Sequence, residues 1–188
     1  MFISVVIPTY NRRSILEKCL QALEHQDPSG EIENYEVVVV DDGSSDGTPD
    51  WLRQNKARFP HVRLVEQQHG GPAEGRNRGV DHAKGDVIVF IDSDLVVTSS
   101  FLASHARALS RRWNQQGNRL CFTYGAVINT ANFDQPTAER HKLRDLSWAY
   151  FATGNVAIDR DVLERSGLFD LGFRLYGWED LELSLIHI

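Results

Sequence analysis

"YEVVVVDDGSSDGTPD", residues 35–50, reads as a strand that passes through a tight turn into a helix. Four consecutive valines are typical of a strand covered on both faces, as in a parallel sheet. Gly43 and Gly47 suit the turn because glycine readily adopts positive φ. Thr48 and Pro49 then supply an N-cap and a proline at the first helical position, so this stretch predicts one strand-helix unit of an α/β fold.

The same alternation extends to both sides of this unit. Further strands are expected at residues 2–8, 62–66 and 87–92, and helices at residues 14–23 and 72–82. Strands and helices that alternate at this spacing favour a mostly parallel central sheet flanked by helices. We therefore predict an α/β, Rossmann-like fold.

Helix starts are predicted from capping residues. Ser14 and Glu17 have capping-box spacing, and Asp161 is expected to begin a short helix. The rhythm changes after residue 95: a helix is expected at 101–113, and strands follow from the stretches "LCFTYGAVI", 120–128, and "ATGNVAI", 152–158. Because no linker-like stretch separates the halves, the chain is expected to form a single domain over residues 1–188.

Composition limits the function classes. The chain has 188 residues, a formal net charge of −6 and 41% hydrophobic residues. This acidic balance argues against a general nucleic-acid binder, which needs clustered basic side chains. No stretch reaches the roughly 20 apolar residues of a membrane span, so we expect a cytoplasmic chain. Cys19 and Cys121 are expected to be buried free thiols. The C-terminal helical pattern stops without a cap, which predicts a C-terminally truncated fragment.

Polar clusters follow three predicted strands. They are Pro8 to Arg12, the pair Asp41 and Asp42, and Asp92-Ser93-Asp94. Ligands of open parallel sheets bind outside the carboxyl ends of the strands, so these clusters are expected to converge. On an extended strand Asp92 and Asp94 would share one side while Ser93 points away. Two carboxylates on one side suit Mg²⁺ or Mn²⁺, although taken by itself such a pair is more often a solvated turn at a strand end whose aspartates cap the next helix.

Two other clusters suit a nucleotide. At most one of Asp41 and Asp42 can face a ligand, and the other is expected to brace the turn. The stretch "HGGPAEGRNRG", residues 69–79, places glycine N–H groups at a helix start, where they can favour phosphate oxygens. Arg76 and Arg78 could bind phosphate or serve ordinary surface pairing. His69, His105 and His141 are expected at the surface or in a cleft, not as metal ligands, and His187 lies in the terminal stretch.

The ordered set "VVIPTYNR", "VVVVDDGSSDGT", "GGPAEGRNRG", "VFIDSDL", "TGNVAI" and "GWEDLEL" resembles a family 2 glycosyltransferase of the GT-A fold along nearly the whole chain. The resemblance implies an inverting enzyme that uses a nucleotide-diphospho sugar, with UDP-sugars favoured, and a divalent metal. It implies a nucleotide- and metal-binding half, residues 1–95, and an acceptor half that holds the catalytic base, residues 96–188. The implied acceptor is a carbohydrate or glycolipid, in polysaccharide or glycolipid synthesis, with peripheral membrane association left open.

Residue roles follow from the same resemblance. Asp180 corresponds to the catalytic base that takes the acceptor's proton, and Glu179 to a neighbour that orients the acceptor or tunes Asp180. Asp94 corresponds to the direct metal ligand, and Asp92 to a second ligand that also reaches the ribose. The expected nucleotide contacts are Pro8, Thr9, Tyr10, Arg12, Asp42, Arg76, Asp92 and Ser93; the expected donor-sugar or acceptor contacts are Gly154, Asn155 and Trp178.

Two alternatives explain part of the sequence. "VFIDSDLVV" is also typical of a haloacid-dehalogenase-like phosphatase, in which Asp92 would be phosphorylated and Asp94 would act as acid and base. That reading assigns nothing to "PTYN" or "DDGS". A non-catalytic nucleotide-sugar binding fragment is the other alternative, favoured by the abrupt C-terminus and opposed by the intact Asp180.

Overall fold

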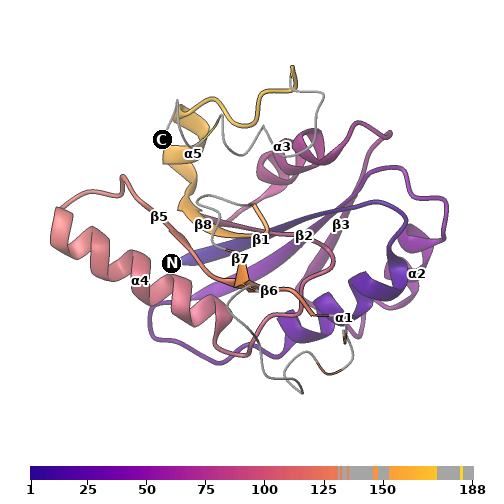
Figure 1. The fold of residues 1–188 in the computed structure, drawn as a ribbon, viewed down its shortest axis with the longest axis horizontal. Helices are drawn as coiled ribbons and strands as arrows, with labels where there is room; N and C mark the ends of the chain where they lie inside the picture. Colours follow the sequence, from indigo (N-terminus) through magenta and orange to yellow (C-terminus); the bar gives the residue numbers. More distant parts are fainter. Residues whose placement is uncertain (131, 133–134, 136–145, 148–152, 173–182, 184–188) are drawn as a thin grey trace.

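The computed structural model describes residues 1–130, 132, 135, 146–147, 153–172 and 183. Within these residues no helix is long and apolar enough to cross a membrane. Strands and helices alternate through the first half of the chain, as the sequence predicts (Figure 1). Their bounds are β1 Phe2–Thr9, α1 Arg13–Glu24, β2 Asn34–Asp41, α2 Thr48–Gln54, β3 Val62–Glu66, α3 Pro72–His82, β4 Val87–Ile91, α4 Phe101–Gln116, β5 Phe122–Tyr124, β6 Val127–Ile128, β7 Leu146–Ser147, β8 Asn155–Asp159 and α5 Arg160–Arg165.

Six strands form the central sheet, in the order β3-β2-β1-β4-β8-β5. The pairs β1–β2, β1–β4 and β2–β3 are parallel, whereas β8 runs antiparallel to β4 and to β5. Strands β6 and β7 form a separate two-stranded sheet. The expected mostly parallel α/β sheet is confirmed, with a single reversed strand, β8, in its second half.

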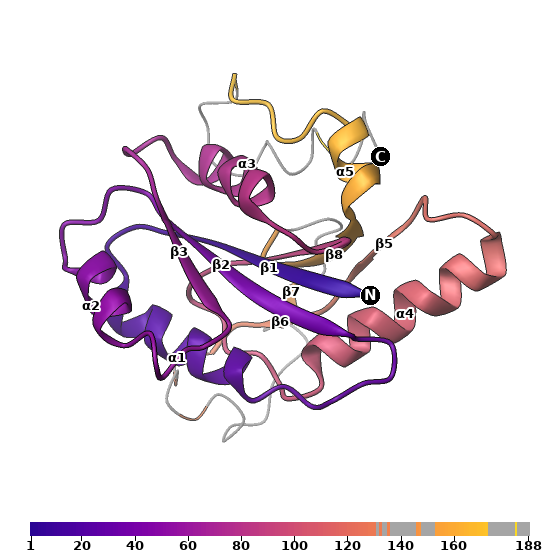
Figure 2. The same cartoon turned by 180° about the vertical axis from the view of Figure 1, so that it is seen from behind.

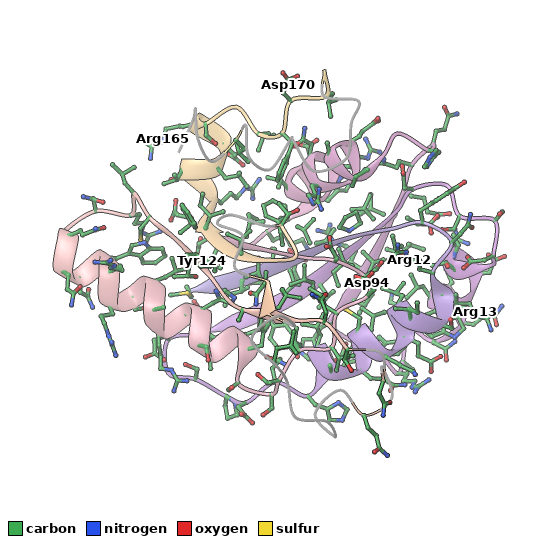
Figure 3. The ribbon with its side chains drawn as sticks, in the orientation of Figure 1. Arg12, Arg13, Asp94, Tyr124, Arg165 and Asp170 are labelled. Atoms are coloured by element: carbon green, nitrogen blue, oxygen red, sulfur yellow. The ribbon has the colours of Figure 1, made fainter. Side chains whose placement is uncertain are left out.

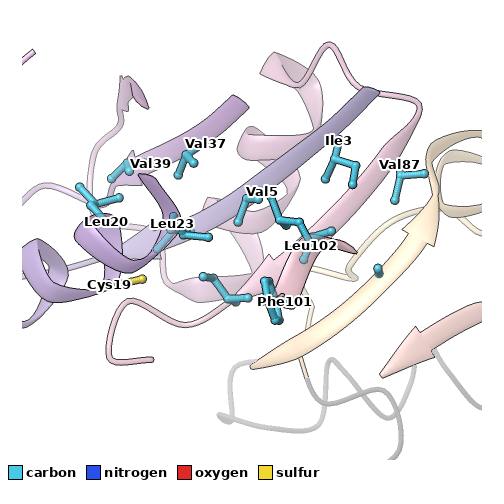
Figure 4. Close-up of a cluster of buried hydrophobic side chains, with 14 of the residues drawn as sticks. Ile3, Val5, Cys19, Leu20, Leu23, Val37, Val39, Val87, Phe101 and Leu102 are labelled. Carbon is cyan, nitrogen blue, oxygen red and sulfur yellow. The ribbon is translucent and has the colours of Figure 1, made fainter. Parts of the chain in front are cut away.

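Helices cover both faces of the sheet (Figures 1 and 2). On one face, alternate residues of β1, β2 and β4 pack against α1, α2 and α4; Figure 4 shows this cluster around Val5, Leu23 and Leu102. On the other face, Val6 and Phe90 belong to the cluster that includes α3 and α5. Both faces of the central sheet are therefore covered by apolar side chains, which explains why the sequences of β2 and β4 are continuous apolar runs.

Several boundaries differ from the sequence-based expectations. Helix α1 begins at Arg13, so Ser14 lies inside it and forms no capping box. Helix α2 has Gly47 at its N-cap, and Thr48 is its first residue. Asp46 supplies the missing acceptor, since its carboxylate accepts from the N–H of Arg13 at 3.0 Å and of Thr48 at 3.1 Å. One carboxylate thus serves two helix starts, which local spacing could not reveal.

Two further expectations need correction in the second half. The stretch 120–128 contains two strands, β5 and β6, which are separated by Gly125 and Ala126 and belong to different sheets. Helix α5 is capped by Asp159, not Asp161: the Asp159 carboxylate accepts from the N–H groups of Asp161 and Val162. Asp159 is buried at the end of β8, and Arg119 pairs with it at 3.1 Å. The expected single α/β domain is retained.

Close packing of α3 on the sheet brings one helix terminus to the carboxyl edge. A Cβ on Gly79 would lie 2.3 Å from Val6 Cγ1, so only glycine lets this helix approach β1 so closely. The N-terminal end of α3 consequently lies beside the residues that follow β2 and β4. This edge is where the candidate site forms.

Candidate functional site

The loop after β1 and the loop after β2 are joined by hydrogen bonds. Asn11 N–H donates to Ser44 Oγ at 2.9 Å, and Ser45 N–H donates to Asn11 Oδ1 at 2.7 Å. Asn11 has a φ of 52°, a left-handed conformation that asparagine tolerates better than most residues. The sequence analysis placed Asn11 within the polar cluster Pro8 to Arg12 but gave it no role of its own. An asparagine directly after a strand and before a helix was the signal that could have found it.

Asp41 and Asp42 divide their roles. Asp41 Oδ2 accepts from Ser44 N–H at 2.9 Å and braces the turn, in which Gly43 has a φ of 78°. Asp42 points to the opposite face of the sheet, toward the start of α3. The expectation that one of the two carboxylates braces the turn is confirmed for Asp41.

Asp42 organises the segment that leads into α3. Its Oδ1 accepts from Gln67 Nε2 at 2.7 Å and from Gly70 N–H at 2.8 Å. Its Oδ2 accepts from Gly71 N–H at 2.9 Å and lies 2.8 Å from His69 Nδ1. The expectation that these glycine N–H groups bind phosphate is therefore wrong for this structure, because the buried Asp42 carboxylate already takes both donors.

Asp92, Ser93 and Asp94 follow β4, which ends at Ile91. The Asp92 and Asp94 side chains are 36% and 43% exposed, whereas Ser93 is buried. This division matches the expectation, but its cause is different: Leu95 N–H donates to the Asp92 carbonyl at 3.3 Å, so a turn and not strand alternation sets the directions. Both carboxylates open toward solvent at the carboxyl edge of the sheet.

Two arginines from other motifs hold these carboxylates. Arg12 Nη1 lies 2.5 Å from Asp94 Oδ2, and Figure 3 shows the two side chains side by side. Arg76 Nη2 lies 3.2 Å from Asp92 Oδ1. The Arg76 side chain is only 3% exposed and its guanidinium also lies over the ring of Phe169, whereas Arg78 is exposed. Of the two arginines in α3, Arg76 is therefore the one at the site.

A divalent cation fits the donor set. No group of three or more His, Cys, Asp or Glu side chains that could hold a metal lies among the described residues. Asp92 and Asp94 are two half-exposed oxygen donors on the same turn. Mg²⁺ is typically bound through one or two carboxylates and completes its coordination with substrate phosphates, so two open carboxylates suffice. A closed protein cage is not required.

A buried thiol lies beneath the site. The Cys19 thiol is buried under the turn, with Sγ 4.0 Å from the Asp92 carbonyl oxygen. Burial, and then the negative charges of Asp94 and Asp92, raise the pKa of Cys19 far above its ordinary value. Cys19 is thus an inert core thiol, as expected, while Cys121 is only partly buried.

Strand β8 brings the "TGN" stretch beside Asp92. Asn155 pairs with Ile91 across the antiparallel ladder, and a Cβ on Gly154 would lie 3.3 Å from Asp92 Oδ2. The backbone at Gly154 thus lies close to the Asp92 carboxylate. This stretch therefore lies beside the turn that carries Asp92.

His105 is buried between α4, β5 and β8, so its expected surface or cleft position is wrong. Its Nδ1 lies 2.7 Å from Thr123 Oγ1 and its Nε2 lies 2.9 Å from Asn155 Oδ1. Burial lowers the pKa of His105, against the opposing effect of the Asn155 hydrogen bond. A neutral ring that donates from Nε2 and accepts at Nδ1 satisfies both partners and fixes the Asn155 amide.

The remaining expected residues divide into two groups. Pro8 and the buried Thr9 end β1, and Tyr10 is 44% exposed on the loop after it. Trp178, Glu179 and Asp180 lie outside the described residues, as do His141 and His187. The structure therefore assembles the expected nucleotide and metal residues at one edge, together with Gly154 and Asn155.

Comparison with known sequences gives a family. Residues 4–167 match the family described as Glycosyl transferase family 2. Validoxylamine A glucosyltransferase from Streptomyces hygroscopicus subsp. jinggangensis is 38% identical over 97% of this chain, which covers 50% of that protein. Glycosyltransferase AglE from Haloferax volcanii is 31% identical over 89% of this chain, which covers 56% of it. The chain thus spans about half the length of these curated relatives.

Comparison with solved structures gives the fold. Mannosyltransferase PcManGT from Pyrobaculum calidifontis, solved in complex with GDP-Man and Mn²⁺, has a TM-score of 0.68 at 29% identity; the match covers 97% of this chain and 50% of that one. S. aureus TarS 1–349 in complex with UDP has a TM-score of 0.67 at 23% identity, over 98% of this chain and 54% of that one. The expected GT-A architecture is confirmed by these likenesses.

Proposed function

The chain belongs to glycosyl transferase family 2, and from this premise we propose that it transfers a sugar, with inversion, from a nucleotide-diphospho sugar to an acceptor hydroxyl. The observation that carries the proposal is the pair of half-exposed carboxylates, Asp92 and Asp94, on the turn after β4. They lie at the edge where parallel sheets bind nucleotides, beside Asp42 and Tyr10. The family match removes the phosphatase alternative, which assigned no role to the loops after β1 and β2.

The proposed donor site uses residues of the first half, 1–95. Pro8, Thr9 and Tyr10 lie against the base and ribose, and Asp42 accepts from the base. We take UDP as the preferred nucleotide, since a carboxylate acceptor suits the N3–H of uracil. The hydrogen bonds that tie the loop after β1 to the loop after β2 support this assignment because they hold both loops in one arrangement.

The proposed metal site consists of Asp94 as the direct ligand and Asp92 as the second carboxylate, which also reaches the ribose beside Ser93. Mn²⁺ or Mg²⁺ bound there would supply positive charge to the departing diphosphate. Arg12 must then exchange Asp94 for the phosphate oxygens. Because an exposed ion pair is worth only about 0.2–1 kcal/mol, this exchange costs little. The Mn²⁺ complex of the mannosyltransferase at 29% identity supports metal use.

The proposed chemistry belongs to the second half, 96–188. The acceptor oxygen attacks the anomeric carbon, the bond to the diphosphate breaks, and the acceptor proton passes to Asp180. Glu179 orients the acceptor, while Trp178, Gly154 and Asn155 contact the sugars. Thr123 hydrogen-bonds to His105, and His105 hydrogen-bonds to Asn155. This chain of hydrogen bonds supports the sugar-contacting role of Asn155, because it holds the Asn155 amide in one orientation.

The proposed acceptor class is a carbohydrate or glycolipid, in polysaccharide or glycolipid synthesis in the cytoplasm. The named glycosyltransferase relatives support the reaction class.

Calorimetric titration with UDP, GDP and dTDP, each with and without Mn²⁺, tests the donor site. We expect UDP to bind in the presence of Mn²⁺, and Asp94→Asn to abolish the metal dependence. Asp50→Asn, an exposed carboxylate on α2, is the matched control and leaves binding unchanged. Failure of every nucleoside diphosphate to bind with Mn²⁺ refutes the proposal.

Release of UDP from a UDP-sugar panel tests the transfer step. We expect Asp180→Asn to lower release while UDP affinity is retained, because the base acts after the donor binds. Release that survives this substitution contradicts the assignment of Asp180. UDP binding with no release from any donor and acceptor pair favours the binding-fragment alternative.

A further inference from the structure

The strongest unexplained feature of the site is a stacked pair at its mouth. The rings of Tyr10 and His69 have centroids 4.2 Å apart and an interplanar angle of 25°. Tyr10 belongs to the loop after β1, and His69 to the segment before α3. The His69 side chain is 58% exposed, so the stack lies at the entrance and not in the core.

His69 also binds the carboxylate that we assign to the base. Its Nδ1 lies 2.8 Å from Asp42 Oδ2 and 3.2 Å from the Asp42 carbonyl oxygen. Both partners are acceptors, so Nδ1 must carry the proton. His69 therefore presents a flat heterocycle that stacks on Tyr10 and donates an N–H to Asp42.

Stacking on Tyr10 and donation of an N–H to Asp42 are the two contacts that the proposed function gives to a nucleobase. An ionised carboxylate offers about four acceptor positions. Gln67, Gly70, Gly71 and His69 already use four on Asp42. Two of these donors are backbone N–H groups of the segment that opens α3, and His69 is an exposed side chain at the mouth. Gln67 is also a side-chain donor, but it is partly buried whereas His69 is exposed, so His69 is the donor that a base entering from solvent replaces first.

Resting on the proposed function, we propose that His69 occupies the nucleobase subsite as an internal substitute for the base and leaves it when the nucleotide binds. Only molecules in which the Tyr10–His69 stack is open can bind the nucleotide. The stability of this stack therefore sets the nucleotide affinity. His69 is thus an affinity- and specificity-determining residue: a base must replace both its ring stack and its N–H. A base without an N–H aimed at Asp42 does not regain the second contact.

A second histidine provides a matched control. His61 stacks on Tyr35 with centroids 4.2 Å apart and an interplanar angle of 15°, and its Nδ1 lies 2.6 Å from Glu24 Oε2. Tyr35 lies at the start of β2 and Glu24 at the end of α1, so this cluster is at the opposite end of β2 from Asp42. It has the same chemistry as the His69 cluster but no place in the donor site.

Calorimetric titration with UDP and Mn²⁺ tests the proposal on the wild-type chain, His69→Ala and His61→Ala. Removing the competing ring should tighten UDP binding by about 3- to 70-fold in His69→Ala, from the free energy of one ring stack and one partly exposed His69–Asp42 pair. His61→Ala should bind UDP like the wild type. In ¹⁵N-histidine spectra of the wild type, UDP should shift the His69 ring signals and leave those of His61 unchanged.

The outcomes separate this inference from the proposed function. UDP binding by the wild type with equal or weaker binding by His69→Ala overturns the inference alone, since the ring would then be a wall of the site. UDP binding by His69→Ala but not by the wild type supports both. Absence of UDP binding in all three proteins overturns both.

Discussion

Asp42→Asn is the substitution whose effect can be worked out most fully from the structure. Asparagine keeps the shape of aspartate but replaces one acceptor oxygen with an NH₂ group, which cannot accept. If Oδ1 is replaced, the N–H of Gly70 loses its acceptor; if Oδ2 is replaced, the N–H of Gly71 does. The side chains of Gln67 and His69 can rotate away, but these backbone groups cannot.

The expected loss is therefore one partly buried backbone hydrogen bond to a charged acceptor in either orientation. Such bonds contribute about 1.5–3 kcal/mol, and the partner side chain adds a smaller loss. We expect the free energy of unfolding to fall by about 2–3 kcal/mol, which for a chain of this size corresponds to about 5–10 °C in Tm. The segment that leads into α3 should loosen first.

Thermal and urea unfolding, followed by circular dichroism, measure this loss. Asp50→Asn is the control, because the Asp50 side chain is 76% exposed and pairs with Arg53 on the surface of α2. Its Tm should change by less than about 2 °C. Hydrogen exchange should become faster at Gly70 and Gly71 in Asp42→Asn. Equal Tm values for the two variants, with unchanged exchange at these glycines, would refute the role given to Asp42.

Three further predictions concern stability and reactivity. Gly79→Ala should lower the free energy of unfolding by about 1–3 kcal/mol in urea, because its Cβ would lie 2.3 Å from Val6 Cγ1; Gly30→Ala, with no atom within 4 Å of its Cβ, is the control, and equal midpoints would contradict the packing argument. Burial lowers the pKa of His105 below the ordinary value of 6.5, so the unfolded chain binds the proton first and stability should fall as pH drops below 6.5. The drop in Tm between pH 7.5 and 5.5 should be smaller in His105→Gln, and an identical drop would rule out this source. Cys19 should resist a thiol reagent at pH 8 until the protein unfolds, since it is buried and its pKa is raised; modification of both cysteines at equal rates would disprove this.

Local patterns were enough to predict most elements of the first half. Leu16, Cys19, Leu20 and Leu23 repeat at helical spacing, and these are the residues that α1 buries. The valines of β2 form a run that is apolar throughout, which indicates cover on both faces. Alternation of such strands with helices leaves a parallel sheet as the natural arrangement, and in a parallel sheet the ends of the strands share one edge.

Contacts between distant residues were beyond these patterns. Asp46 and Asp159 cap helices from outside the stretches in which spacing rules look for caps. His105 became a buried residue only when β5 and β8 packed against α4 and supplied partners for both ring nitrogens. The glycine N–H groups before α3 suited an anion, and the anion proved to be the carboxylate of Asp42.

The sequence by itself determined the α/β class, the buried faces and the edge of the sheet where the polar residues gather, because these depend on periodicity and on the order of the elements. Only the tertiary structure decided which partner each polar residue takes. Arg12 is paired with Asp94 and Arg76 with Asp92, across 82 and 16 residues of sequence. Hydrogen bonds and ion pairs need atoms within about 3 Å, and folding alone brings such residues that close.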